Sequence, residues 1–237
     1  MDRFNTTYRA GTNTQTAEYD EGLRAYMLKV YNYMASGVLL TGIVAMFVSE
    51  SETMKAIIFG GPQAYVVMLA PFAFILAMSF GLNKMKSSTL QMLFWLFAGT
   101  MGLSLSSVLL AYTGESVART FFITAAAFGA LSLYGYTTKK SLSGFGTFLT
   151  MGLFGLIIAM VVNFFLQSTM MEFIISVGGV LIFAGLTAYD TQRIKENYAM
   201  MTSGEAVAKG AIMGALNLYL DFVNLFLFLL RFMGNRN

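Results

Sequence analysis

The chain contains no cysteine and no histidine, and only 11% of its 237 residues are charged. Without cysteine, the chain cannot form a disulfide, hold an iron–sulfur cluster or a cysteine-type zinc site, or use a thiol nucleophile. Without histidine, it lacks the usual general base, the usual transition-metal ligand and the side chain that most often titrates near neutral pH. Proline is also scarce, at two residues.

Apolar residues, by contrast, are abundant in this chain. Hydrophobic residues make up 57% of the sequence and aromatic residues 15%, and the mean hydropathy is +0.65. Soluble domains carry about 25% charged residues, and a soluble fold of this size could not hide so much apolar surface from water. The composition therefore predicts a protein whose solvent is lipid. It argues against a soluble enzyme, a disordered chain and a nucleic-acid binder, and the net charge of +3 is too small to indicate a basic binding groove.

The few charges mark the ends of long apolar runs. A spanning helix needs about 20 apolar residues, and each run can supply one span but not two with a turn. The runs predict an all-α membrane protein with seven transmembrane helices, at about residues 28–48, 64–83, 89–112, 118–137, 143–166, 172–191 and 208–231. Residues 1–23 are polar and predict a flexible tail without a signal peptide. Residues 24–237 then form one transmembrane domain.

Lysine and arginine are unevenly divided between the two ends of these helices. If the N-terminus is inside, eleven of the fifteen basic residues fall on the inner side and four on the outer side. Because inner loops of membrane proteins carry the excess of basic residues, this division predicts an N-in, C-out orientation.

The last predicted helix carries a polar stripe on one face. Its members recur every three or four residues and are Gly210, Gly214, Asn217, Asp221, Asn224, Phe228 and Arg231. A packing contact glued by hydrogen bonds would explain the glycines and the amides. The carboxyl group of Asp221 argues for more, because a charge near the bilayer midplane costs about 2.5–3.5 kcal/mol on insertion scales. An acid at that depth is a candidate functional site.

A second acid, Asp190, ends the sixth predicted helix near the inner interface. An ion pair with Arg193 or Lys195 would explain this residue without any function. Counted from the helix ends, Asp190 and Asp221 lie about 10–15 Å apart along the membrane normal, so the residues alone do not predict a contact between them.

Three stretches resemble the transmembrane Bax inhibitor motif (TMBIM) family, and its bacterial branch in particular. They are Phe121-Phe-Ile-Thr-Ala-Ala-Ala-Phe-Gly-Ala-Leu-Ser-Leu-Tyr-Gly-Tyr-Thr-Thr-Lys-Lys-Ser-Leu-Ser, Gly185-Leu-Thr-Ala-Tyr-Asp-Thr-Gln-Arg-Ile-Lys and Ala215-Leu-Asn-Leu-Tyr-Leu-Asp-Phe-Val-Asn-Leu-Phe. The resemblance covers about residues 24–234. It implies a seven-helix bundle whose C-terminal helix is central and surrounded by the other six, in a bacterial cytoplasmic (inner) membrane.

The resemblance also implies a pH-sensitive calcium leak. Asp190 and Asp221 match the family's pair of aspartates, and Lys84 is the best match to an arginine that latches the pair in the bacterial calcium-leak members. Lysine lacks the bidentate fork of arginine, so the sequence departs from the family's pattern at that position.

Two neighbouring carboxyl groups cannot both ionise cheaply, so we expect Asp190 and Asp221 to share one proton. Loss of that proton would set two negative charges face to face, separate the last two helices and open a path for a divalent cation. Calcium takes six to eight oxygen ligands. The two carboxylates, together with Asn217, Asn224, carbonyl groups and water on the face that also carries Gly214, would form a weak calcium site suited to conduction.

Two other functions stay open for the same sequence. One is a non-conducting membrane regulator that binds a membrane protease or another membrane protein. The other is an intramembrane aspartyl protease, although Leu218-Tyr219-Leu220-Asp221 departs from the Gly-x-Gly-Asp motif that such enzymes carry. We expect no enzyme activity, no cofactor and no nucleic-acid partner. The expected partners are the lipid bilayer and calcium ions.

Overall fold

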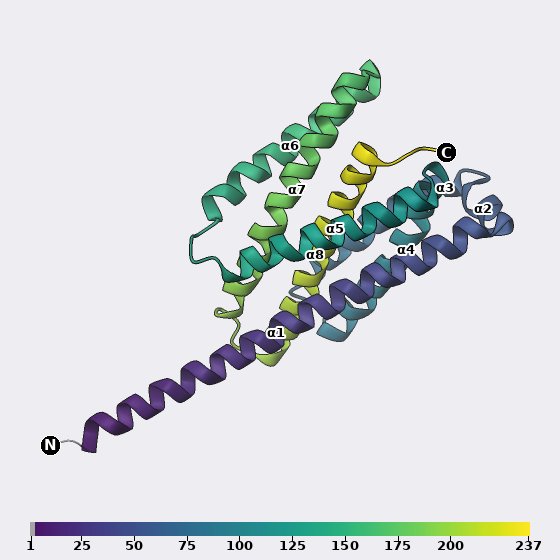
Figure 1. Cartoon of the computed structure of the whole chain (residues 1–237). Coiled ribbons are helices and arrows are strands. Elements are labelled where there is room, and N and C mark those ends of the chain that lie inside the picture. The colour runs from purple at the N-terminus through teal and green to yellow at the C-terminus, as the bar shows by residue number, and fades with distance from the viewer. Residues whose placement is uncertain (1–2) are drawn as a thin grey trace.

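The computed structural model describes residues 3–237, with side chains from residue 18 onward. The described residues form eight helices and no sheet, and one isolated backbone bridge joins Tyr112 to Arg236 (Figure 1). The helices are α1 (Arg3–Glu50), α2 (Glu52–Phe59), α3 (Gln63–Gly81), α4 (Ser87–Ala111), α5 (Gly114–Thr137), α6 (Ser143–Leu166), α7 (Thr169–Tyr198) and α8 (Gly204–Met233).

The predicted number of membrane spans is confirmed. Within the described residues, every helix except the short α2 is long and apolar enough to cross a membrane, which makes seven. α6 has the predicted bounds, whereas α7 and α8 extend well beyond theirs. α2 is not among the predicted helices, because its eight residues are too few for a span.

The predicted polar tail, residues 1–23, lies largely outside the described side chains. The backbone of residues 3–23 is described and is helical, continuous with the first span, and side chains are described from residue 18 onward. The side chain of Leu23 is buried in the core. Leu23 therefore packs with the helices of the bundle, and the division into a tail and a domain stays a prediction.

Short polar residues fix where four of the helices begin. The side chains of Ser51, Thr113, Ser168 and Ser203 each accept a hydrogen bond from the backbone N–H three residues later, at 3.2–3.3 Å. Such N-caps satisfy one of the N–H groups that the first turn leaves without a partner. The α8 cap at Ser203 matters most for the site, because it starts α8 earlier than the sequence predicted.

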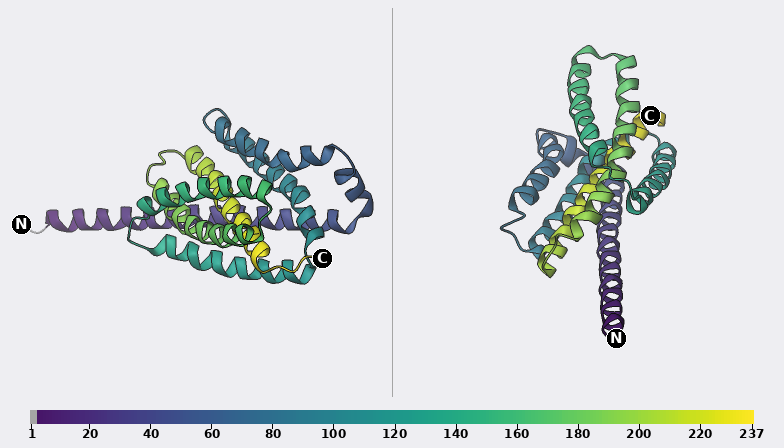
Figure 2. Two further views of the ribbon diagram at one scale, coloured as in Figure 1. Left: turned by 90° about the horizontal axis from the view of Figure 1, so that it is seen from above. Right: turned by 90° about the vertical axis from the view of Figure 1, so that its left-hand side faces the viewer.

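α8 is the central helix of the bundle, as the family resemblance implied. In its most apolar stretch, 61% of the residues are buried, against 11–28% in the other six spans. It packs against α1, α4, α5 and α7. α3 and α6 lie further out, α3 against α4 and α6 against α7 (Figure 2). The expectation that α8 is surrounded by all six other helices is therefore corrected to four.

The largest core cluster lies where α8 meets α1 and α4. Tyr219 is fully buried there and stacks edge-on against Phe94 and Phe97. Its hydroxyl group lies 2.7 Å from that of Thr41, which donates to the carbonyl oxygen of Ala98 at 2.8 Å. This contact joins three helices two residues before Asp221.

Candidate intramembrane carboxylate site

The polar stripe predicted on the last helix lies along α7. A Cβ on Gly214 would sit 3.2 Å from the side chain of Ile194, so the absence of a side chain lets the helices approach. Nearer the C-terminal end of α8, the ring of Phe228 occupies the space that a Cβ on Gly179 of α7 would need. The packing role that the sequence suggested for the stripe is therefore real, and it fixes how α7 and α8 are aligned.

That alignment brings the two aspartates to nearly the same depth. α7 and α8 run antiparallel, and the two glycine contacts place Asp190 at the level of Asn217. Asn217 is one helical turn, about 5.4 Å, from Asp221. The separation of 10–15 Å expected from the sequence was too large, because α7 continues eight residues past Asp190 and α8 begins at Gly204.

The carboxyl groups of Asp190 and Asp221 interact directly. Asp221 is 4% exposed, and its Oδ2 atom has no hydrogen-bond donor among the described residues. Asp190 is half-buried. Since two carboxylates have no proton to donate, a hydrogen bond between them requires that one carries a proton.

Arg193 is the cation whose charge acts on Asp190. Its side chain is exposed, one turn further along α7. Within the described residues, Asp190 forms no salt bridge with Arg193 or Lys195, and the ammonium group of Lys195 instead donates to the carbonyl oxygen of Tyr136 at 2.7 Å. An interfacial ion pair with Arg193 or Lys195 therefore does not explain the position of Asp190.

Lys84 lies in the connection between α3 and α4, and its side chain is exposed. It is not among the charged groups that act on Asp190 or Asp221. Nearby, Lys209 of α8 donates to the carbonyl oxygen of Leu82 at 3.1 Å. The structure thus brings together the two predicted aspartates but does not bring Lys84 to them.

Gln192 fixes the end of α7 that carries Asp190, a role the sequence analysis did not identify. Its buried amide accepts a hydrogen bond from Leu142 N at 2.7 Å and donates to the carbonyl oxygen of Lys140 at 2.9 Å. Both partners lie in the connection between α5 and α6. The sequence offers no clear signal for this role, because Gln192 lies in the polar stretch 190–197, where an exposed amide is equally expected.

A chain of hydroxyl groups lies beside Asp190 and joins three helices. Tyr31 of α1 lies 2.6 Å from the hydroxyl group of Ser132 in α5, which lies 2.9 Å from that of Thr191 in α7. Thr191 also donates to the carbonyl oxygen of Thr187 at 2.7 Å. Nothing in the sequence indicates this chain, because hydroxyl groups in membrane helices usually bond their own backbone.

The oxygen atoms of this region fall short of a resident calcium site. No group of three or more acidic side chains able to hold a metal ion occurs among the described residues. The amide of Asn224 donates to the carbonyl oxygen of Leu220 at 2.8 Å, which leaves its own oxygen free to accept. Two carboxyl groups and two amide oxygens reach the lower limit of the six to eight ligands that calcium takes only if both carboxylates bind through both oxygens, and otherwise water must supply the rest.

These features define the class of protein: an integral membrane protein with seven long apolar helices and one acidic residue inside each of the last two. A family model described as Bax1-I, inhibitor of apoptosis-promoting Bax1, matches residues 23–237, and the chain belongs to this family. The resemblance of the three sequence stretches to this family is therefore confirmed.

The relatives cover nearly the whole chain. The chain is 48% identical over 225 residues to the protein RP147 of Rickettsia prowazekii, which covers 95% of both chains. It is 43% identical over 218 residues to the inner membrane protein YbhL of Escherichia coli (strain K12), covering 91% of this chain and 93% of YbhL. Together with the seven apolar helices, these matches identify an integral protein of the bacterial inner membrane.

Proposed function

We propose that this protein is a pH-sensitive calcium leak channel gated by Asp190 and Asp221. The observation that carries the proposal is the direct interaction of two carboxyl groups from neighbouring helices inside the bundle. An intramembrane acid is costly, and such residues commonly mark ion or proton pathways. A chain without histidine still has, in this pair, a group that can exchange a proton within the membrane.

In the closed state, Asp190 and Asp221 share one proton, and the resulting hydrogen bond holds α7 against α8. Loss of the proton leaves two negative charges in contact, and their repulsion separates the helices. The exposed carboxylates then attract a divalent cation, which is held weakly and can leave again. Calcium is the permeating ion here, not a resident cofactor, and no enzymatic step is part of the proposal.

Arg193 replaces Lys84 as the cation associated with the pair in this proposal. Its charge acts on Asp190, whereas Lys84 is exposed and apart from both carboxyl groups. A positive charge beside Asp190 favours the ionised pair and hence the open state. Arg193→Ala is therefore expected to shift opening to more alkaline pH. Lys84→Ala raises the leak at acidic pH only if Lys84 is the latch that the family resemblance implies.

Calcium influx into liposomes across a pH series tests the proposal. The full chain should admit calcium more rapidly as pH rises, and Asp190→Asn and Asp221→Asn should each flatten that dependence, because an amide cannot ionise. Asp20→Asn is the matched control, since Asp20 is exposed near the start of the described side chains. A wild-type leak that ignores pH, or aspartate variants that keep the wild-type profile, would contradict the gate.

The alternatives give different results in the same preparation. Folded protein that conducts no calcium at any pH would favour the non-conducting regulator of a membrane protease or other membrane protein. Cleavage of a membrane substrate that is lost with either aspartate substitution would favour the intramembrane protease.

A further inference from the structure

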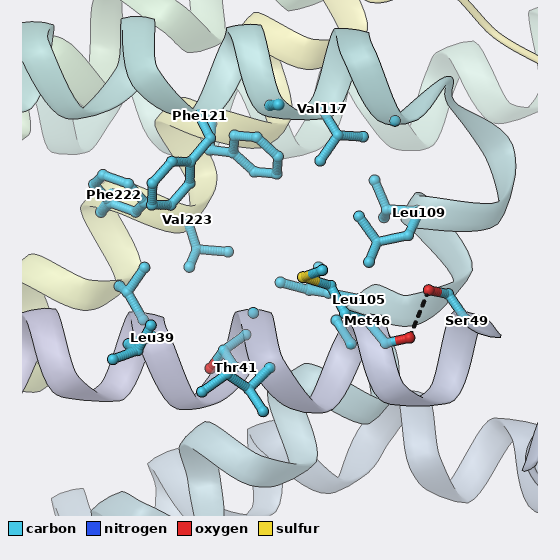
Figure 3. A pocket seen from close by; sticks show the side chains of 18 of the residues that line it. Leu39, Thr41, Met46, Ser49, Leu105, Leu109, Val117, Phe121, Phe222 and Val223 are labelled. Carbon is cyan, nitrogen blue, oxygen red and sulfur yellow. Dashed lines mark hydrogen bonds between the residues drawn. The ribbon is translucent and has the colours of Figure 1, made fainter. Parts of the chain in front are cut away.

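An apolar cavity of about 520 Å³ lies between α1 and α5, away from the aspartate pair (Figure 3). Leu39 and Met46 of α1 form one wall, and Val117 and Phe121 of α5 form the opposite wall. α4 and α8 close the back, α8 through residues that directly follow Asp221. Its volume is within the range of ligand pockets, about 300–1,000 Å³.

Apart from the carboxylate of Glu50 at its mouth, the walls offer almost nothing for water to bind. The two hydroxyl groups that reach the cavity are already used, Thr41 by Ala98 and Tyr219, and Ser49 by the carbonyl oxygen of Met46 at 2.9 Å. Cavities that hold water supply two to four polar partners for it, and purely apolar cavities stay dry or take an apolar guest. In a membrane protein the abundant apolar guest is a hydrocarbon chain.

The cavity opens sideways toward the bilayer. Leu39, Ile43 and Met46 are 56–65% exposed along its α1 edge, and Phe122 is 71% exposed along its α5 edge. Leu39 and Glu50 lie eleven positions apart on the α1 edge, which corresponds to about 16 Å along the helix. An elongated guest can therefore enter from the lipid side and lie along α1.

The mouth at the end of α1 is acidic. Glu50 lines the cavity, and Glu115 directly follows Gly114, which also lines it. Neither carboxylate forms an ion pair within the described residues, whereas the nearby Lys55 is paired with Glu52, and Arg231 and Arg236 with Glu172. Arg119, four residues after Glu115, is exposed and also forms no ion pair; it donates to the carbonyl oxygen of Met233 at 3.4 Å. The mouth therefore carries two unpaired carboxylates and one unpaired guanidinium group, and the two carboxylates complement an ammonium group.

We propose that this cavity binds one acyl chain of a phospholipid whose headgroup carries a free ammonium group. The chain lies between α1 and α5 against Phe222 and Val223 of α8, and the ammonium group lies at Glu50 and Glu115. The site is separate from the aspartate pair and does not depend on calcium conduction.

Photo-crosslinking tests this site in the full chain. The protein is placed in lipid nanodiscs that contain a trace of phosphatidylethanolamine with a diazirine in its acyl chain, and adducts are mapped by mass spectrometry. Residues 39–46 and 117–122 should be labelled several-fold more than the lipid-facing residues of α6. The same diazirine chain on phosphatidylglycerol, which lacks an ammonium group, should label them less.

Two glycine substitutions provide a matched pair. A Cβ on Gly42, which lines the cavity, or on Gly129, which is exposed on α5 outside it, would meet no atom within 4 Å. Gly42→Phe should fill the cavity and reduce labelling to the level of α6, whereas Gly129→Phe should leave labelling unchanged. Glu50→Gln with Glu115→Gln should remove the difference between the two headgroups.

Labelling of the cavity no stronger than that of α6, or equal labelling by the two lipids in the wild-type protein, would overturn the proposal. Because the comparison of the two lipids uses only the wild-type chain, it decides the matter even if Gly42→Phe does not fold.

Discussion

At the scale of single residues, the contacts around α8 depend on which atom donates each hydrogen bond. Thr41 has one hydroxyl proton and gives it to the carbonyl oxygen of Ala98, so the Tyr219 hydroxyl group must donate to Thr41. Removing the Tyr219 hydroxyl group therefore leaves Thr41 with its own acceptor, whereas removing the Thr41 hydroxyl group leaves the Tyr219 hydroxyl group without an acceptor.

We expect Thr41→Val to be more destabilising than Tyr219→Phe. Tyr219→Phe removes a hydrogen bond worth about 1 kcal/mol, whereas Thr41→Val also leaves a buried phenol without an acceptor, at about 1–3 kcal/mol. Thermal unfolding in detergent, followed by circular dichroism, gives the order. Tyr65→Phe is the control, because Tyr65 is 72% exposed and should leave the midpoint unchanged. Equal losses for Thr41→Val and Tyr219→Phe would contradict the assigned donor.

Gly135 of α5 permits the closest approach to α7. A Cβ at this position would strike the backbone carbonyl of Ala188, two residues before Asp190, and backbone cannot move aside as a side chain can. We expect Gly135→Ala to lower the free energy of unfolding by about 1–3 kcal/mol, the usual cost of overpacking. Gly129→Ala, one and a half turns earlier on the open face of α5, should instead be neutral or stabilise by up to about 1 kcal/mol. Chemical denaturation of both variants in the same detergent checks this, and similar effects would argue against the close contact.

At the scale of elements, α7 is positioned from both of its ends. Gln192 ties one end to the connection between α5 and α6, and Lys195 ties it to the last turn of α5. At the other end, Glu172 pairs with Arg236 at 2.8 Å and with Arg231 at 3.5 Å. The exposed ion pairs contribute at most about 1 kcal/mol, so the buried amide of Gln192 is the stronger constraint on the segment that carries Asp190.

We expect Gln192→Leu to loosen the connection between α5 and α6. The change leaves Leu142 N and the carbonyl oxygen of Lys140 without their partner, at a cost of about 1–3 kcal/mol. Trypsin should then cut after Lys139 and Lys140, both exposed, several times faster than in the wild-type protein. Gln91→Leu removes the same group from an exposed position and should not change the rate. An unchanged rate in Gln192→Leu would show that other contacts hold this connection.

At the scale of the whole molecule, the orientation in the membrane follows from the basic residues. Eleven of the fifteen lie on the side where α8 begins, which we propose is the cytoplasmic side. The two ends of the bundle then face different compartments.

Because the chain has no cysteine, single cysteines report this orientation without background. In spheroplasts, a membrane-impermeant maleimide should label Glu115→Cys directly and Lys140→Cys only after permeabilisation, since both positions are exposed. The reverse pattern would mean that the N-terminus faces outward.

Much of the fold could be predicted from the sequence because the bilayer imposes a length on every apolar run. Charged residues are too costly to bury in lipid, so their positions marked the seven helices, and at α6 both bounds were predicted correctly. The polar stripe of α8 was also visible, since a three- and four-residue spacing keeps side chains on one helical face. The helix α2 was missed because so short a helix has neither an apolar run of span length nor a polar stripe of this kind.

The sequence by itself determined that this protein spans a membrane, how many times, and which two acids lie inside it, because these properties depend on composition and helical periodicity. Only the tertiary structure decided that Asp190 and Asp221 meet, that Lys84 forms no salt bridge with either of them, and that a cavity separates α1 from α5. Those properties depend on the alignment of α7 against α8 and on how far each helix extends past its apolar run. Both are set by contacts such as Gly214 with Ile194 and Gln192 with Leu142, between residues that are distant along the chain.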